Sequence, residues 1–388
     1  MSAPDVVVVG AGITGAVASH ALVEAGAQVE VIDAYGPAAM ASGWTLAGVR
    51  QSGRDPAELP LALEAVRRWP HLDGILGAPT HYRQDGNLRL ARTEAEVATI
   101  RRLVETQMAA GLDLKLLPDN AAVRAVVPAL SDRILAASFC PSDGRADPVA
   151  TVHAFLTAAE RGGARVVGGE RVVELVYKGG RVTGVRTSTR VLPAGAVILA
   201  SGIETNALLE RLGVAIPLTV PIVTVIRTTP VAPLLRPVLG VANANLAVRQ
   251  EVSGALRFTS GAEPFGRPLD EENGRPVARP RAGNVMETIA RVGDVLPDIA
   301  GLEIAAMWGG LLDLTPDALP VIDRVPGLDN LVVAAGFSGH GFGIGPVTGE
   351  LAADLVLGRT PGLPLDAFRF DRFSSAPVSA PAELTLHG

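Results

Sequence analysis

The stretch that decides the fold of this 388-residue chain is residues 5–33, which read DVVVVGAGITGAVASHALVEAGAQVEVID. The valine run 6–9 predicts a buried strand, a glycine turn follows it at once, and residues 16–25 have the composition of a helix. A second apolar strand then ends on a carboxylate at Asp33. A GxGxxG turn between a strand and a helix, with an acid about twenty residues on, is typical of a dinucleotide-binding βαβ unit.

Each part of this turn has a physical task. Gly10 permits the tight turn, Gly12 lets the backbone approach a pyrophosphate, and Gly15 lets the helix pack closely on the strand. The start of the helix offers free N–H groups and the positive end of its dipole to the phosphates. An acid at Asp33 accepts hydrogen bonds from ribose hydroxyls and opposes a 2′-phosphate, which argues against NADP. The alternative is a chance glycine turn in an ordinary βαβ unit.

The composition indicates a large apolar core and excludes several kinds of partner. Hydrophobic residues make up 48% of the chain and the net charge is −6, so we expect no nucleic-acid partner. Cys140 is the only cysteine, which leaves no disulfide within the chain and no CxxC redox pair. We also expect no metal site and no membrane span. Because no signal-like segment precedes the first strand, we expect a cytoplasmic location.

The order of predicted elements points to two interleaved domains. Patterns like those of the N-terminal unit return in the middle of the chain and near its end, and alternating strand patterns fill the segments between them. We therefore predict an α/β fold in which a discontinuous Rossmann-like dinucleotide-binding domain carries an inserted α+β substrate domain on an antiparallel sheet. The nucleotide-binding domain comprises residues 1–80, 141–216 and 301–374, the substrate domain comprises 81–140 and 217–300, and 375–388 form a tail. The active site is expected where the two domains meet.

A second glycine cluster, residues 336–346, reads GFSGHGFGIGP and follows an apolar strand. Such a density of glycine indicates backbone that approaches a ligand closely. Pro346 lacks the N–H that a pyrophosphate would use, so we favour a helix start aimed at a flavin ring, with the helix running over 347–357. A turn fixed by packing alone is the alternative.

With these motifs the chain resembles the D-amino-acid oxidase superfamily of FAD-dependent oxidoreductases, and within it the branch of sarcosine oxidase β-subunits and glycine oxidases. The resemblance rests on the N-terminal fingerprint extended through Ser19 and Gly26, the loops 41–43 and 46–50, the middle motifs 147–148 and 198–202, the late motifs 308–311 and 315–322, and the closing motif 339–342. It is thin over residues 80–140 and 217–300, which form most of the predicted substrate domain.

The resemblance implies FAD bound in an extended form and oxidation of a C–N bond beside a carboxylate. Hydride would leave the α-carbon for flavin N5, and water would hydrolyse the resulting imine. The implied partners are a small amino-acid or amine substrate and either molecular oxygen or an electron carrier as acceptor, with the chain as a possible subunit of a hetero-oligomer. Together the glycine turn and the resemblance assign these residues to the cofactor: Gly10, Gly12, Ile13, Thr14, Gly15, Asp33, Ala34, Ser42, Gly43, Gly48, Val49, Val172, Ser201, Gly202, Gly309, Gly339, His340, Gly341, Phe342 and Gly343.

The chain departs from the branch at its substrate-binding positions. Arg50 aligns with an arginine that contacts the substrate carboxylate, and a planar guanidinium suits that group. Gly343, however, stands where the branch often has a lysine for the same carboxylate. Neither of the two lysines, Lys115 and Lys178, falls at the position of the branch's oxygen-activating lysine, which favours a dehydrogenase over a fast oxidase.

The remaining candidates follow from the same resemblance. The attachment cysteine of the family falls near Ala306 or Met307, so we expect FAD to be held without a covalent bond. Arg50 and His340 are the catalytic candidates, and the substrate-binding candidates are Arg50, Arg249, Gln250 and Trp308. Packing in the core or at the surface is the alternative role for each of them.

Two other functions stay open at this point. The chain can be an electron-relaying flavoprotein subunit of a larger amine or opine dehydrogenase complex. It can also be an NAD(P)H-dependent FAD hydroxylase, although the lack of a second convincing dinucleotide motif argues against that function.

Overall fold

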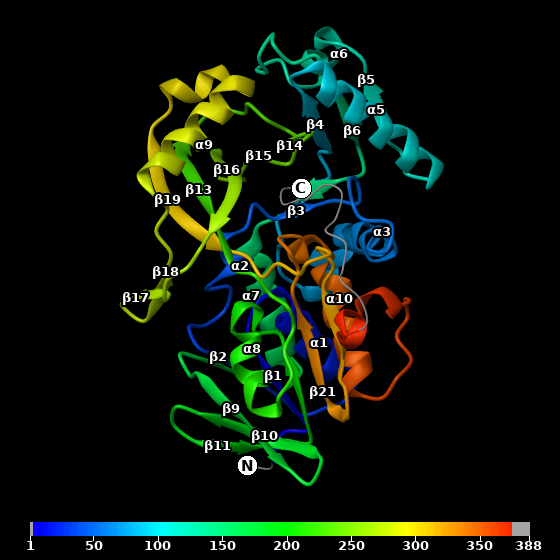
Figure 1. The fold of residues 1–388 in the computed structure, drawn as a ribbon, viewed down its shortest axis with the longest axis vertical. Coiled ribbons are helices and arrows are strands. Elements are labelled where there is room, and N and C mark those ends of the chain that lie inside the picture. Colours follow the sequence, from blue (N-terminus) through cyan, green and yellow to red (C-terminus); the bar gives the residue numbers. More distant parts are fainter. Residues whose placement is uncertain (1–2, 375–388) are drawn as a thin grey trace.

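The structure is a computed structural model that describes residues 3–374, and Figure 1 shows its two halves one above the other. In that view the lower half holds α1 (Ile13–Glu24) and β1 (Val6–Val9), and the upper half holds a large, mainly antiparallel sheet. The predicted α/β fold with a Rossmann-like unit and a second antiparallel sheet is confirmed. Residues 375–388, predicted as a tail, lie outside the described residues.

A six-stranded sheet forms the centre of the lower half. Its order is β20-β21-β12-β1-β2-β8, and all pairings are parallel except that of β20 with β21. Its other strands are β2 (Val29–Asp33), β8 (Arg165–Gly168), β12 (Ala196–Leu199), β20 (Val321–Val325) and β21 (Leu328–Ala335). Val6 and Val8 belong to the apolar core on one face, and Val7 and Val9 belong to the core on the other. Because both faces are covered, β1 is a continuous apolar run.

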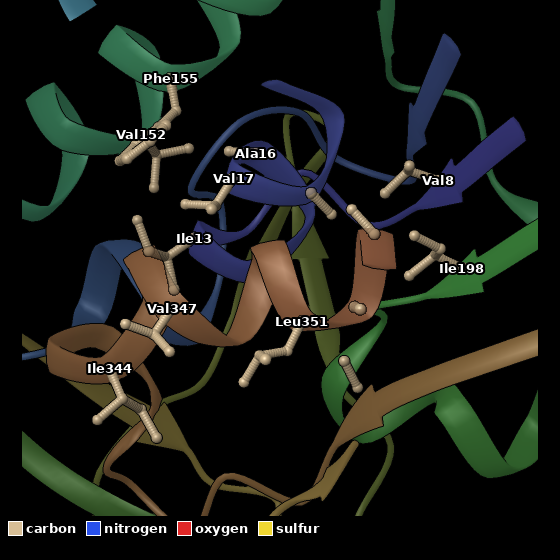
Figure 2. Close-up of a cluster of buried hydrophobic side chains, with 14 of the residues drawn as sticks. Val8, Ile13, Ala16, Val17, Val152, Phe155, Ile198, Ile344, Val347 and Leu351 are labelled. Atoms are coloured by element: carbon tan, nitrogen blue, oxygen red, sulfur yellow. The ribbon is translucent and has the colours of Figure 1, made fainter. Parts of the chain in front are cut away.

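Helices cover one face of this sheet and a small sheet covers the other. On the helical face α1 packs against both α7 (Pro148–Arg161) and α10 (Gly341–Val356), and Figure 2 shows their apolar side chains gathered in one cluster. The opposite core contains residues of α8 (Thr205–Leu209) and of the three-stranded sheet. That sheet consists of β9 (Val172–Lys178), β10 (Arg181–Thr187) and β11 (Val191–Pro193).

The upper half is built on an eight-stranded sheet of order β19-β13-β16-β15-β14-β4-β6-β5. Its strands are β4 (Asn87–Ala91), β5 (Lys115–Leu117), β6 (Ala136–Cys140), β13 (Pro221–Pro230), β14 (Val238–Val241), β15 (Leu246–Gln250), β16 (Ala255–Pro264) and β19 (Ile304–Leu311). One face packs under α6 (Asn120–Val126) and α9 (Ala282–Val295) in a shared apolar core. We call the opposite face, which carries Val225 and Ala247, the inner face of this sheet.

The remaining elements connect these layers. They are α2 (Ala41–Trp44), α3 (Leu59–Arg68), α4 (Leu72–Leu76), α5 (Glu94–Ala109), the paired strands β3 (Gly48–Val49) and β7 (Gly144–Arg145), and the hairpin of β17 (Asp270–Glu272) and β18 (Arg275–Val277). Short 3₁₀ helices span Trp69–His71, Gly202–Glu204, Glu210–Leu212, Pro297–Gly301, Asp366–Phe368 and Phe370–Phe373. None of the helices within residues 3–374 has the length and apolar composition that crossing a membrane requires.

The last helix begins earlier than the sequence predicts. The expected start at Val347 is wrong, because α10 begins at Gly341 and contains Pro346 in its interior. A Cβ added at Gly345 would lie 2.4 Å from Ile13 Cγ1, and one added at Gly349 would lie 2.5 Å from Val17 Cβ. The glycines therefore let α10 pack directly on α1, so part of the second glycine cluster serves packing between helices rather than a ligand.

The sheets also bear on the domain boundaries. β19 pairs with β13 in the eight-stranded sheet, although the sequence analysis assigns residues 301–374 to the nucleotide-binding domain. We propose that the substrate domain extends to Leu311 and that the other boundaries stand as predicted.

Candidate active site

A cavity of about 440 Å³ lies between the two halves and extends from the end of β2 to the start of α10. Asp33 lines it at one end, and His340 lines it at the other. The inner face of the eight-stranded sheet supplies part of the wall through Val225 and Ala247. Seventeen of the residues assigned from the sequence line it: Gly10, Gly12, Ile13, Thr14, Asp33, Ala34, Ser42, Gly48, Arg50, Val172, Ser201, Gly202, Gly339, His340, Gly341, Phe342 and Gly343. The two glycine clusters, more than 300 residues apart in the chain, thus share one cavity.

Asp33 also fixes the glycine turn itself. Its carboxylate accepts hydrogen bonds from the backbone N–H of Ala11 at 2.7 Å and from the N–H groups of Tyr35 and Gly36, each at 2.8 Å. At the start of α1, the N–H of Ile13 donates to Ser42 Oγ at 2.9 Å. The strand end, the turn and the α2 loop are therefore held together around the helix terminus.

The backbone at this turn leaves no room for side chains. A Cβ on Gly12 would lie 2.9 Å from Ser42 Oγ, and one on Gly10 would lie 2.3 Å from the Ala200 carbonyl oxygen. Gly10 also has a φ of +107°, which favours glycine. A bare turn, a helix start and an acid around one elongated cavity fit the pyrophosphate and ribose of a dinucleotide, and these residues would hold it.

Four residues assigned to the cofactor do not reach the cavity, and each has a packing role instead. A Cβ on Gly15 would lie 2.0 Å from the Gly10 carbonyl oxygen, and one on Gly43 would lie 2.0 Å from that of Ala38. Gly309 packs against Ile222, whose Cδ1 would lie 2.4 Å from an added Cβ. The side chain of Val49 is in the apolar core. Gly310, the neighbour of Gly309, lines the cavity in its place.

Arg50 lies in the cavity wall within a buried cluster of charged groups. Its side chain is 2% exposed, and its Nη1 donates to the carbonyl oxygen of Ser52 at 2.5 Å. Burial, followed by the nearby guanidinium groups of Arg54 and Arg89, lowers the pKa of Arg50 well below its usual value. An anion bound at Arg50 would relieve this repulsion.

Arg54 connects its own loop to Glu58 and to His340 at the cavity. Glu58 was not among the site residues predicted from the sequence. Arg54 Nη1 forms an ion pair with Glu58 Oε2 at 3.0 Å, and its Nη1 and Nη2 both lie 3.4 Å from the His340 carbonyl oxygen. Burial alone would raise the pKa of Glu58, but Arg54 and then His340 outweigh it and hold that pKa at about 2. The spacing of four residues between Arg54 and Glu58 was the available sequence signal.

His340 is the N-terminal cap residue of α10, and its side chain faces Glu58. Its Nδ1 lies 3.6 Å from Glu58 Oε2. Burial lowers the pKa of His340, although Glu58 opposes this shift, so the imidazole is neutral at pH 7. A catalytic role for His340 remains a prediction.

Two buried acids that the sequence analysis missed order the loops of the site. Asp143 accepts hydrogen bonds from the hydroxyl of Ser52 and from the N–H of Gln51, the latter at 2.8 Å, and burial raises its pKa. Asp313 lines the cavity and accepts from the N–H of Gly336 at 2.7 Å, while burial raises its pKa to about 6. Both contacts join residues far apart in the chain, so local patterns carry no signal for them.

Three substrate-binding candidates lie outside the cavity wall. The predicted contact of Gln250 with the substrate disagrees with the structure. Val248, two residues earlier on β15, points into the core under α9, and Gln250 points the same way because side chains two residues apart on a strand share a face. Its amide is bonded to the backbone of Leu234 and Leu235 and to nearby carbonyl groups. Arg249 and Trp308 lie on the inner face, next to the residues that line the cavity.

The hairpin of β17 and β18 reaches the end of the cavity that Asp33 lines. Tyr35 Oη donates to Glu271 Oε1 at 2.7 Å, and Arg171 forms ion pairs with Glu271 at 3.2 Å and with Glu204 at 3.1 Å. Tyr35, Arg171 and Glu204 line the cavity, whereas Glu271 belongs to β17. Burial and then the bond to Glu271 raise the pKa of Tyr35 to about 12, so the phenol remains a donor at neutral pH.

The fold and the cavity are those of a dinucleotide-dependent enzyme. The chain belongs to the family of FAD-dependent oxidoreductases, whose model, described as DAO, matches residues 5–355. It is therefore an FAD-dependent oxidoreductase, as the sequence resemblance predicts, and its cofactor is FAD.

Relatives and solved structures agree with this family. The chain is 28% identical to the peroxisomal sarcosine oxidase of Homo sapiens over 96% of each chain. It is 26% identical to a D-amino acid dehydrogenase of Cereibacter sphaeroides over 95% of each chain. The structure of L-proline dehydrogenase from P. horikoshii superposes with a TM-score of 0.87 at 27% identity, covering 96% of this chain and 98% of that one. The names of all three relatives describe oxidation or dehydrogenation of amino acids.

The hairpin contact leads to a test of how firmly FAD is retained. Replacing Glu271 with glutamine should speed FAD release about two- to fivefold. The effect should be small because the ion pair that joins the hairpin to Arg171 in the cavity wall is half-exposed and contributes about 1 kcal/mol or less. The difference from wild type should shrink as salt screens that pair. Release is measured from the rise in flavin fluorescence after dilution.

Glu272→Gln is the matched control for this experiment. Glu272 lies on the same hairpin and carries the same charge, but it pairs with Arg279 within the hairpin region and not with a cavity residue. Equal release rates for the two variants would show that the Glu271 contact does not retain FAD.

Proposed function

We propose that the protein oxidises the C–N bond of an amino acid or an N-substituted amino acid, giving an imine that water hydrolyses. The observation that carries this proposal is the buried guanidinium of Arg50 in the cavity wall, in a cluster where Arg50, Arg54 and Arg89 outnumber Glu58 and Asp143. Such a cluster favours an anionic ligand, and the carboxylate of an amino acid fits a planar guanidinium. The names of the relatives support the same substrate class.

The residues of the chain bind and orient the substrate in this proposal. Arg50 holds the substrate carboxylate, and the inner sheet face, with Val225 and Ala247, covers the rest of the substrate and excludes water. When bound, FAD supplies the acceptor for the hydride that leaves the carbon beside nitrogen. His340, neutral and buried at the start of α10, is placed to hold a proton at its imidazole.

The mode of FAD binding and the electron acceptor belong to the proposal as well. Ala306 and Met307 offer no side chain for a thioether, and the structure places both on β19 outside the cavity wall, so we propose non-covalent FAD. Either molecular oxygen or an electron carrier takes the electrons.

The test is anaerobic mixing of the flavin-loaded protein with D- and L-amino acids and their N-methyl forms. We expect at least one of them to bleach the flavin absorbance with saturable kinetics. If dithionite bleaches the flavin but no amine in the panel does, the proposal fails and the chain is an electron-relaying subunit. Rapid bleaching by NADH alone would instead indicate a hydroxylase.

A further inference from the structure

Three arginines form a row across the inner face of the eight-stranded sheet. Arg249 of β15 stands directly opposite Arg257 of β16, and Arg257 stands directly opposite Arg227 of β13. Residues that are directly opposite on neighbouring strands share a face, and like charges in such pairs repel each other. Arg249 and Arg257 are only 3% and 8% exposed, so water screens this repulsion poorly. We call these three residues the arginine row.

The arginine row lies next to the cavity wall, two residues further along each of its three strands. Ala247, Thr259 and Val225 line the cavity, and each is two residues from one arginine of the row on the same strand. Two residues along a strand span about 6.6–6.8 Å. Arg257 Nη1 also donates at 2.7 Å to the carbonyl oxygen of Thr45, which itself lines the cavity. The far end of a small substrate held in the cavity is therefore within reach of these guanidinium groups.

The same sheet face carries buried N–H donors that have no hydrogen-bond partner within the described residues. They are Arg249 Nε, Trp308 Nε1 and Asn87 Nδ2. Trp308 stands opposite Val225, and Asn87 is on this face because the adjacent Leu88 points into the core under α6 and α9. Arg249 belongs to the row, and the guanidinium of Arg257 lies 5.2 Å from the centre of the Trp308 ring, so a carboxylate bound at the row would meet unpaired donors there.

The charges around the row are only partly balanced. Glu251 forms an ion pair with Arg257 at 2.6 Å. Arg249 Nη1 donates at 2.6 Å to the carbonyl oxygen of Ala146, a contact that does not cancel its charge. Burial and then the neighbouring Arg257 lower the pKa of Arg249 to about 9, so a bound anion would stabilise this cation.

We propose that the arginine row binds a second anionic group of the substrate, so that the preferred substrate is an amino acid with two carboxylates. Arg50 holds the carboxylate beside the reacting carbon, and Arg249, Arg257 and Arg227 hold the other. This inference rests on the proposed function and names its substrate class. In the other account of the row, its arginines only tie the sheet to the backbone at Thr45 and Ala146.

Ligand binding to the flavin-loaded protein tests the proposal without turnover. Succinate and glutarate are compared with their monoamides, which have the same shape but one charge less, by the change in the flavin absorbance spectrum on titration. We expect the dicarboxylates to bind about 10- to 100-fold more tightly. Equal affinity of acid and monoamide for the wild-type protein would overturn the proposal.

Two variants that should change the acid-to-amide affinity ratio in opposite directions extend this test. Arg249→Gln should bring the acid-to-amide affinity ratio close to one, and Glu251→Gln, which frees Arg257, should raise it. If Arg249→Gln does not fold, Arg227→Gln at the more exposed end of the row should lower the ratio. A variant that loses thermal stability but keeps the wild-type ratio would show that the row is only structural.

Oxidation of isosteric pairs separates this inference from the proposed function. Aspartate is compared with asparagine, and glutamate with glutamine, in both enantiomers and as N-methyl forms. Faster bleaching by the acids supports the inference, whereas equal bleaching by acids and amides contradicts it and leaves the proposed function intact. If neither these compounds nor any amine of the wider panel bleaches the flavin, the proposed function is contradicted. The comparison of succinate with its monoamide then still shows whether the row prefers a second negative charge.

Discussion

Arg50→Ala should lower kcat/KM for an amino-acid substrate about 100- to 1000-fold while the protein keeps its flavin. Arg50 is 2% exposed in the cavity wall, and loss of one partner of a buried charge pair costs about 3–4 kcal/mol. Most of the effect should appear in KM, because in our account Arg50 holds the same carboxylate before and during the reaction. Stopped-flow reduction of the flavin measures both constants, and acid release of FAD measures the flavin content.

Arg50→Lys is the control for a loss of charge in this cluster. It keeps the positive charge beside Asp143 but removes the planar pair of donors, so it should recover part of the affinity and fold normally. An unchanged KM in the alanine variant, with full flavin content, would remove Arg50 from the role of carboxylate ligand.

Gly349→Val should lower the free energy of unfolding by about 3 kcal/mol and weaken FAD binding with it. A Cβ at this position would lie 2.5 Å from Val17 Cβ and 2.7 Å from the Thr14 carbonyl oxygen, so α10 must move away from α1. Both helices start at the cavity, and their displacement disturbs both ends of the FAD site. Denaturant unfolding and FAD titration measure the two effects.

Gly283→Val is the matched control, because Gly283 is also a helical glycine and no atom lies within 4 Å of its added Cβ. It should change stability by less than about 1 kcal/mol. Equal losses in the two variants would show that helix propensity, rather than the contact between α1 and α10, determines the result.

The sequence predicted those parts of the fold that local patterns specify. The residues around Gly10, Gly12 and Asp33 form the βαβ unit as expected, and the late glycine cluster opens on the same cavity. The start of α10 was misplaced because Pro346 suggests a helix boundary in a sequence window. In the structure, close packing on α1 overrides that local preference.

The site was predictable where the residues lie on one turn or loop, and less so elsewhere. Asp143 and Asp313 order the site through hydrogen bonds to loops distant in the chain, and no rule of residue spacing predicts such contacts. The assignment of both Arg249 and Gln250 to the substrate ignored strand alternation, since adjacent residues point to opposite faces. The same alternation, applied across β13, β15 and β16, places the arginine row on the inner face.

The central claim is that one FAD molecule extends through the cavity from Asp33 to the start of α10. A crystal structure of the protein grown with FAD tests it most directly. Our account predicts the ribose at Asp33, the pyrophosphate at Gly12 and the start of α1, and the isoalloxazine ring at residues 339–343 beside Arg50. A ring bound elsewhere, or a different molecule in this cavity, would contradict it.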